Sequence, residues 1–157
     1  MTPESAFLDL LSHCQPKRLL ALGPFAQGLA EQWLAQHQGI HFTLASSPDP
    51  TAEPALSEPQ DLALISNTLE DLEKPAAVLL LGHLRNLGSQ QIAVLVNDEA
   101  PMQFNDFIGL GFVRQARFEE PTPQTLFTYN IANYNRKRDW NNARNWANPE
   151  MWDKARW

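Results

Sequence analysis

The sequence predicts a three-layer α/β fold with a mostly parallel sheet of about six strands and a C-terminal antiparallel hairpin. Short apolar runs alternate with helical segments along the chain, and two segments of alternating hydrophobicity end the pattern. The length of 157 residues suits one compact domain. Because right-handed crossovers join parallel strands, helices should cover both faces of the sheet.

The chain opens with a predicted helix. Thr2 can cap it and Pro3 suits its first position, while Pro16 marks its end. Residues 19–22 form a continuous apolar run that is typical of a buried parallel strand, and a second helix follows Gly23 directly.

The middle of the domain holds two more strands. Gly39 is expected to end the second helix, and residues 41–45 form the second strand. Residues 46–60 are rich in proline, serine and glutamate and should be irregular. Residues 61–66 give a third apolar strand, and residues 68–73 a short helical turn.

A longer helix is predicted from Pro75, with Gly88 after its end, and residues 91–96 form the fourth strand. The apolar side of this helix is expected to hold five residues: Ala76, Leu79, Leu80, Leu84 and Leu87.

The domain closes with a short helix over 104–110, ended by Gly111, and a hairpin. Residues 112–118 and 125–131 alternate between apolar and polar side chains, which is typical of two antiparallel strands. The alternation places four residues on one face of the first of them: Phe112, Arg114, Ala116 and Phe118.

Composition limits the classes of function. One cysteine excludes an internal disulfide framework, and the net charge of −6 argues against attraction of the whole domain to nucleic acid. The sequence contains neither a membrane-spanning run nor a signal peptide pattern, so a cytoplasmic protein is expected. No metal site is expected, because the four histidines lack the spacing of metal ligands.

The charge is divided unevenly along the chain. Residues 1–131 carry 6 basic and 15 acidic side chains, a net charge of −9, whereas residues 132–157 carry 6 basic and 3 acidic side chains, a net charge of +3. Four of the five tryptophans lie in the second segment. We therefore predict an α/β domain over 1–131 and a Trp/Asn/Arg-rich tail over 132–157.

The tail allows three interpretations. It docks on its own acidic domain, contacts a protein partner, or binds single-stranded nucleic acid, although a net charge of +3 is small for the last role. The residues expected to form its interface are Arg138, Trp140, Arg144, Trp146, Trp152, Arg156 and Trp157.

Two segments carry a family resemblance. Residues 61–72 read Asp-Leu-Ala-Leu-Ile-Ser-Asn-Thr-Leu-Glu-Asp-Leu and resemble the fourth strand and the Leu-Glu-His-Leu turn of class I S-adenosylmethionine-dependent methyltransferases. Residues 107–112 and the hairpin resemble the last helix and strands of that fold. The likeness covers residues 18–131 and is closest to the small, type 11-like methyltransferases that include MetW. The chain also resembles a bacterial family of degenerate domains with a Trp-rich tail.

The resemblance implies a cofactor site beyond the carboxyl ends of the strands, where open α/β sheets bind ligands. If S-adenosylmethionine binds there, the residues that would hold it are Gly23, Pro24, Phe25, Gly28, Ser46, Ser66 and Asn67.

The chain departs from the family pattern at this site. Ala21 stands where the family has a carboxylate, and Phe25 replaces the second glycine of its loop. The Phe25 ring is therefore expected to fill the cofactor space or to force the loop outward. The carboxylate that holds the ribose after the second strand is missing before Asp49. The 15 residues of 46–60 also leave no room for the family's third strand.

Two weaker features lie nearby. Backbone N–H groups at Gly23 to Phe25, where a helix begins, are expected to suit a small anion. The cluster Glu70, Asp71 and Glu73 is interpreted as a solvated face that compensates a helix dipole. No catalytic residue is assigned.

These departures predict a degenerate methyltransferase-like domain that acts as a binding or regulatory module, without methyl transfer and without a cofactor. The alternative is an active S-adenosylmethionine-dependent methyltransferase with an atypical cofactor loop, acting on a small molecule. A second alternative is an RNA-associated protein that uses the Trp and Arg residues of the tail.

Overall fold

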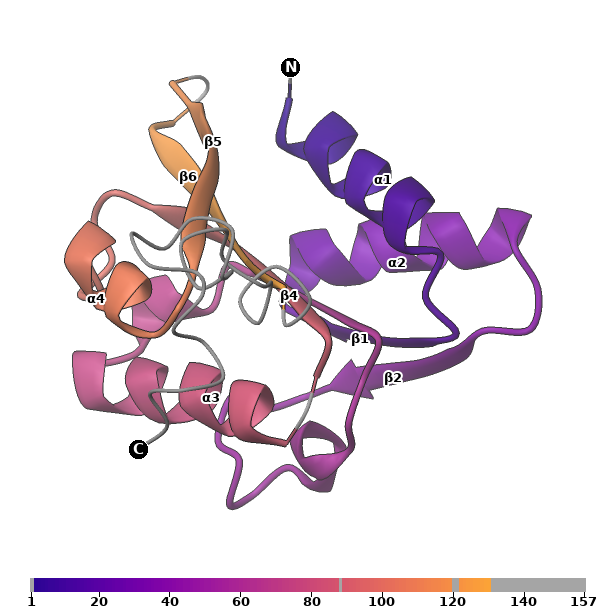
Figure 1. Cartoon of the computed structure of the whole chain (residues 1–157), viewed down its shortest axis with the longest axis horizontal. Coiled ribbons are helices and arrows are strands. Elements are labelled where there is room, and N and C mark those ends of the chain that lie inside the picture. The colour runs from indigo at the N-terminus through magenta and orange to yellow at the C-terminus, as the bar shows by residue number, and fades with distance from the viewer. Residues whose placement is uncertain (1, 88, 120–121, 131–157) are drawn as a thin grey trace, which may run out of the picture.

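The computed structural model describes residues 2–87, 89–119 and 122–130, and the predicted α/β fold is confirmed (Figure 1). Six strands form one sheet in the order β2-β1-β3-β4-β6-β5. The strands are β1 Arg18–Leu22, β2 His41–Ala45, β3 Leu62–Ser66, β4 Gln91–Asn97, β5 Val113–Phe118 and β6 Gln124–Asn130. The helices of the described residues are α1 Pro3–Cys14, α2 Pro24–Gln36, α3 Lys74–Asn86, α4 Phe104–Gly109 and two short 3-10 helices, η1 Pro54–Ser57 and η2 Leu69–Asp71.

The first four strands are parallel and the last two form the antiparallel edge. β1 pairs with β2 and β3, and β3 pairs with β4, all in parallel, whereas β6 is antiparallel to both β4 and β5. Among the described residues, no strand lies beyond β2. This agrees with the expectation that the family's third strand is missing.

Helices cover both faces of the sheet, as Figure 1 shows: α1 and α2 lie on one side, and α3 and α4 on the other. Successive side chains of β3 point to opposite faces of the sheet, so this strand contributes to the hydrophobic core on each face. Leu62 and Leu64 pack with α1 and α2, whereas Ala63 and Ile65 pack with α3 and α4. All five residues of β3 are buried, which explains why this strand reads as a continuous apolar run.

Helix α2 ends earlier than predicted. Its last residue is Gln36, and His37 has an extended backbone with φ −133°, so Gly39 does not end the helix. The reason lies in the His37 side chain. Its Nδ1 atom lies 3.0 Å from the carbonyl oxygen of Trp33, the atom that the His37 N–H would bond in a continued helix.

The predicted apolar side of α3 is wrong in part. The residues that face the sheet are Ala77, Leu80, Leu81 and Leu84. Leu79 is 54% exposed and Leu87 36% exposed. Three consecutive leucines, 79–81, make two neighbouring faces of the helix about equally apolar, so the helical period alone could not choose between them.

The predicted single face of the first hairpin strand is also wrong. Phe112 packs in the core beside α3 and α4, whereas Phe118 packs in the core beside α1 and α2. The register of β5 against β6 shifts between Arg114 and Ala116, which is a β-bulge at Gln115. A bulge adds one residue to one strand, and the side chains that follow it therefore change faces.

Candidate functional site

A pocket with a volume of about 690 Å³ lies at the carboxyl ends of β1, β2 and β3. This is the edge where open α/β sheets bind ligands. Four of the seven predicted cofactor residues line it: Gly23, Pro24, Ser46 and Asn67. Phe25, Gly28 and Ser66 are not among its lining residues. Gly28 instead lies on the exposed side of α2 with open space around its Cα.

The ring of Phe25 points away from this pocket, so the expectation that it fills the cofactor space is wrong. Its centroid lies 5.7 Å from that of Phe7 in α1, and the side chain packs against the core beside α1 and α2. Because α1 covers the start of α2, it offers an apolar surface on which the ring is buried in preference to the open pocket.

Gly23 is required by the fold itself. It precedes α2 with φ +97°, a conformation that favours glycine, and it lies against the end of β3. A Cβ atom at this position would overlap the backbone carbonyl oxygen of Ser66. The close approach that this glycine allows is therefore to the chain's own backbone.

The donors at the start of α2 already have partners within the chain. The Ala26 N–H donates to Oγ of Ser66 at 2.8 Å, and the Phe25 N–H donates to Oδ1 of Asn67 at 3.3 Å. Pro24 has no N–H, and the Gln27 N–H bonds the Gly23 carbonyl oxygen at 3.0 Å. The expectation that this helix start offers N–H groups to an anion is wrong for these positions, because the end of β3 caps the helix.

A carboxylate that the sequence analysis missed lies at the end of β2. Oε2 of Glu53 accepts hydrogen bonds from the Ser46 N–H at 2.9 Å and from the Ser46 hydroxyl at 2.6 Å. Glu53 is half-buried and belongs to the segment that was predicted to be irregular. A search limited to the residues that follow β2 directly could not find it, because the loop folds back by seven residues.

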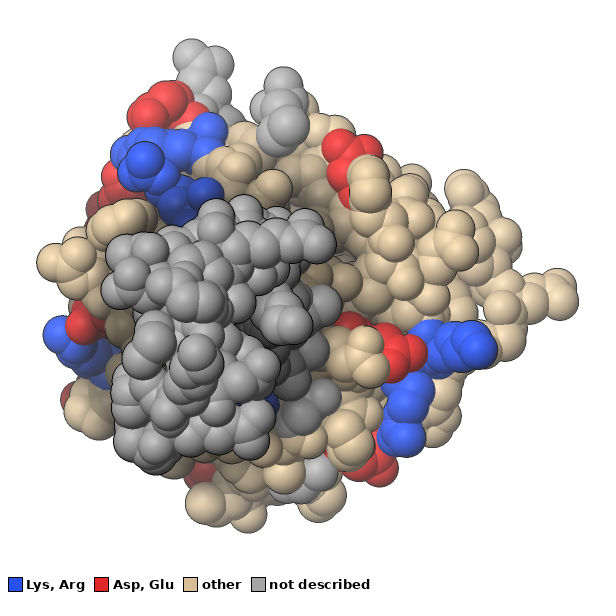
Figure 2. Space-filling model, viewed as in Figure 1, with Lys and Arg blue, Asp and Glu red and all other residues tan. Residues whose placement is uncertain are grey.

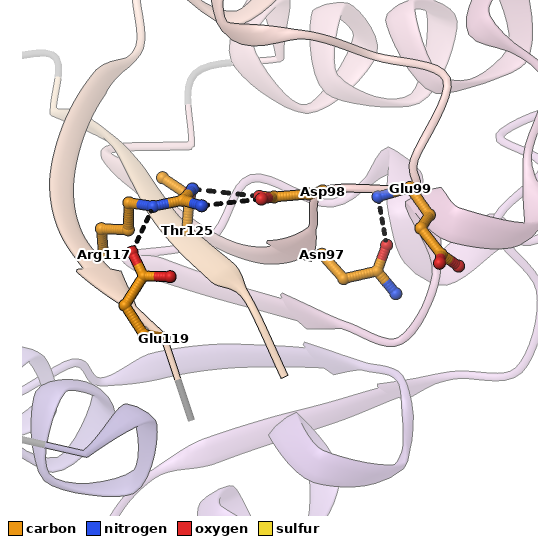
Figure 3. A network of polar contacts seen from close by, with 6 residues as sticks. All are labelled: Asn97, Asp98, Glu99, Arg117, Glu119 and Thr125. Atoms are coloured by element: carbon orange, nitrogen blue, oxygen red, sulfur yellow. Dashed lines mark hydrogen bonds and ion pairs between the residues drawn. The ribbon is translucent and has the colours of Figure 1, made fainter. Parts of the chain in front are cut away.

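A second pocket of about 280 Å³ lies at the carboxyl end of β4, between α4 and the hairpin. Arg117 of β5 forms one of its walls and bonds both carboxylate oxygens of Asp98, at 3.0 and 2.7 Å (Figure 3). The same guanidinium bonds Glu119 at 2.9 Å and the hydroxyl of Thr125 at 3.2 Å. The hydrogen bond from Arg117 lowers the pKa of Asp98, and the carboxylates raise the pKa of Arg117. The network fastens the hairpin to the end of β4.

Glu70 of η2 bonds the end of β4. Its Oε1 atom accepts a hydrogen bond from the Asn97 N–H at 3.0 Å, and its Oε2 atom is buried without a partner among the described residues. Asp71, its neighbour, lines the first pocket, and Asn97 lines the second. For Glu70 the interpretation as part of a solvated face is therefore wrong.

The described residues contain neither a cluster of metal ligands nor a membrane-spanning helix. No group of three or more His, Cys, Asp or Glu side chains there could hold a metal ion. No helix in the described part of the chain has the length and apolar character to cross a membrane.

The strand order and the helices on both faces define an α/β fold of the methyltransferase type, and solved structures share it. The chain belongs to DUF6231, a family of unknown function, which matches residues 1–157. No curated protein matches the chain.

Solved structures share the fold at low sequence identity. A putative O-methyltransferase from Nostoc punctiforme is 13% identical with a TM-score of 0.54, over 80% of this chain and 55% of its own. Human N-acetylserotonin methyltransferase in complex with S-adenosylmethionine is 11% identical with a TM-score of 0.53, over 81% and 51%. Magnesium protoporphyrin IX methyltransferase from Synechocystis, with bound S-adenosylmethionine, is 11% identical with a TM-score of 0.50, over 80% and 77%. The chain thus spans about half the length of the first two.

The predicted tail over 132–157, with all of its expected interface residues, lies outside the described residues. This applies to Arg138, Trp140, Arg144, Trp146, Trp152, Arg156 and Trp157, and to the predicted boundary between 131 and 132. The range that matches the family includes this segment.

Proposed function

We propose that this protein is a degenerate methyltransferase-like domain that acts as a binding or regulatory module and does not transfer methyl groups. The observation that carries the proposal is the capped start of α2. Ser66 and Asn67 occupy the N–H groups of Ala26 and Phe25, so those donors are already bonded before any ligand arrives. A ligand that used them would have to displace bonds that are worth about 1 kcal/mol each.

The missing carboxylates support the same proposal. Ala21 is buried at the end of β1, and no acidic side chain of β1 or β2 lines the first pocket. Glu53, in the loop after β2, does bond the end of this strand. Its Oε2 atom, however, already accepts two hydrogen bonds from Ser46. Of the two carboxylates in the family pattern, the first is therefore absent at Ala21, and the carboxylate found at the end of β2 already bonds Ser46.

The alternative is an active methyltransferase with an atypical loop, and one observation favours it. The pocket of about 690 Å³ is open because the Phe25 ring is packed on Phe7. In this case Gly23, Ser46 and Asn67 would contact S-adenosylmethionine, and positioning of the methyl group would supply most of the catalysis.

The charge of the described surface does not favour the RNA-associated alternative. On the face in Figure 2, Lys and Arg side chains lie in small groups beside Asp and Glu. Three of the six basic residues of 1–131 form ion pairs: Arg18 with Glu58, Lys74 with Asp106, and Arg117 with Asp98 and Glu119. An RNA role would depend on the tail alone.

Calorimetric titration of the full chain with S-adenosylmethionine and S-adenosylhomocysteine tests the proposal. We expect no saturable heat up to about millimolar ligand. A dissociation constant in the low micromolar range would overturn the proposal in favour of the active enzyme. An authentic S-adenosylmethionine-dependent methyltransferase, titrated with the same ligand solution, is the positive control.

A further inference from the structure

Strand β2 forms an open edge of the sheet. It is the end strand in the described part of the chain, where its one neighbour is β1. The His41 N–H donates to the Lys17 carbonyl oxygen at 2.7 Å, so the backbone groups of His41 point toward β1. Because backbone groups of successive residues in a strand point to opposite sides, the N–H and C=O groups of Phe42 and Leu44 point away from the sheet. No described strand pairs with these groups.

The two edges of the sheet differ in how well they resist pairing. The opposite edge strand, β5, contains Arg114 and Arg117 and has a bulge at Gln115. Charged side chains and bulges prevent edge strands from pairing with other chains. β2 contains no Lys, Arg, Asp or Glu residue, and its register with β1 has no bulge. β2 therefore lacks the features that protect the other edge.

Apolar side chains lie beside the outward backbone groups of β2. Phe42 and Leu44 are two residues apart, so they point to the same face of the sheet, the one that α1 and α2 cover. Phe42 is partly buried against the core on this face, whereas Leu44 is 49% exposed. An open edge beside an exposed apolar side chain is the pattern of a site where a further strand adds to a sheet.

The sequence of β2 is complementary to a second copy of itself. In an antiparallel pair centred on Thr43, Phe42 lies opposite Leu44 of the second copy, and Leu44 lies opposite Phe42 of the second copy. Each of these pairs exchanges two N–H···O=C hydrogen bonds, so all outward groups of both strands are used. The two Thr43 side chains meet on the other face, and such cross-strand threonine pairs are favourable. A pair centred on Leu44 would instead place Phe42 opposite Ser46, whose N–H already bonds Glu53.

We propose that two copies of this chain associate through their β2 strands, in an antiparallel pair centred on Thr43, and form one continuous sheet. The interface borders the first pocket, because Leu44 also lines that pocket. A contact of five residues from each strand is small, so we expect a dissociation constant of about 10–100 µM. The association does not depend on whether the pocket binds a cofactor.

Sedimentation equilibrium of the full chain, from about 1 µM to 1 mM, tests the association. Leu44→Lys places a charge on the β2 edge and should weaken the dimer at least about tenfold. Val113→Lys is the matched control, because Val113 is a 55% exposed residue of the other edge strand, and it should leave the dissociation constant unchanged. A native chain that stays monomeric at about 1 mM would overturn the proposal. A dimer that Leu44→Lys does not weaken would also overturn it, since the copies would then meet elsewhere.

Disulfide formation tests the register without relying on the lysine variant. The two Thr43 Cα atoms would lie about 4.5 Å apart, within the range of a disulfide. Each His41 would lie about 14 Å along the strand from its copy. We expect Thr43→Cys to form a disulfide-linked dimer with oxidised glutathione at least about tenfold faster than His41→Cys, although His41 is the more exposed residue. Both are made in a Cys14→Ser background, because Cys14 is the one native cysteine. Equal rates for the two variants would contradict the pairing centred on Thr43.

Discussion

The hydroxyl oxygen of Ser66 accepts a hydrogen bond from the backbone N–H of Ala26 at 2.8 Å, although 40 positions separate the two residues. Through this bond the end of β3 caps the start of α2, at the place where the methyltransferase pattern has its cofactor loop. Asn67 repeats the arrangement at Phe25. The loop is thus stabilised by the chain itself.

Removal of this cap should destabilise the domain. Ser66→Ala leaves the buried Ala26 N–H without an acceptor, and we expect the free energy of unfolding to fall by about 1–3 kcal/mol. Ser12→Ala on the exposed side of α1 is the control, with an expected change below about 0.5 kcal/mol. Urea denaturation followed by circular dichroism measures both. Equal effects of the two variants would show that the Ser66 bond contributes nothing.

The two glycines at the start of α2 should respond with opposite signs to the same substitution. Gly23→Ala places a Cβ against the Ser66 carbonyl at φ +97°, and should lower the free energy of unfolding by about 2–4 kcal/mol. Gly28→Ala meets no atom within 4 Å in an exposed helical position, and should raise it by about 0.5–1 kcal/mol. Thermal and urea unfolding of both variants provide the comparison, and a stable Gly23→Ala protein would contradict the close approach.

Phe25 should act on stability and not on the pocket. Phe25→Ala removes the ring that packs on Phe7, and we expect a loss of about 1–3 kcal/mol, since the side chain is only half-buried. Leu44→Ala is the control, because Leu44 lines the pocket and is 49% exposed, with an expected loss below about 1 kcal/mol. An unchanged stability of Phe25→Ala would mean that the ring does not pack on α1.

Arg117 should determine the titration of Asp98. The hydrogen bond from Arg117 lowers the pKa of Asp98, so this pair stabilises the fold above the pKa of an unfolded aspartate, near 3.9. The contribution is lost as the pH falls through the lower, folded-state pKa. In Arg117→Gln the pKa of Asp98 should rise toward its ordinary value, which carboxyl-carbon NMR titration can follow.

Asp106 provides the internal reference for that titration. Its pKa is lowered by the Gln103 N–H first and by Lys74 second, and neither residue bonds Arg117. The titration of Asp106 should therefore be the same in the native chain and in Arg117→Gln. A parallel shift of both carboxyl groups would point to a general change of the fold instead.

The pattern of the sequence predicted most elements because it is local. Residues 41–45 form the edge strand β2 as expected, and the continuous apolar runs form the buried strands β1, β3 and β4. Predictions failed where two local solutions were about equal. The face of α3 depended on which of Leu79, Leu80 and Leu81 the sheet would cover, and one bulge at Gln115 reversed the side of Phe118.

The sequence by itself therefore determined the order of helices and strands in the described residues, the α/β class and the absence of a described strand beyond β2, because hydrophobic periodicity and capping act within a few residues. Only the tertiary structure decided the chemistry of the candidate site. The direction of Phe25 depends on α1, the bond of Ala26 on the end of β3, and the carboxylate at Ser46 on a returning loop. Such contacts arise when segments far apart in the chain pack together, so the local pattern of apolar and polar residues cannot predict them.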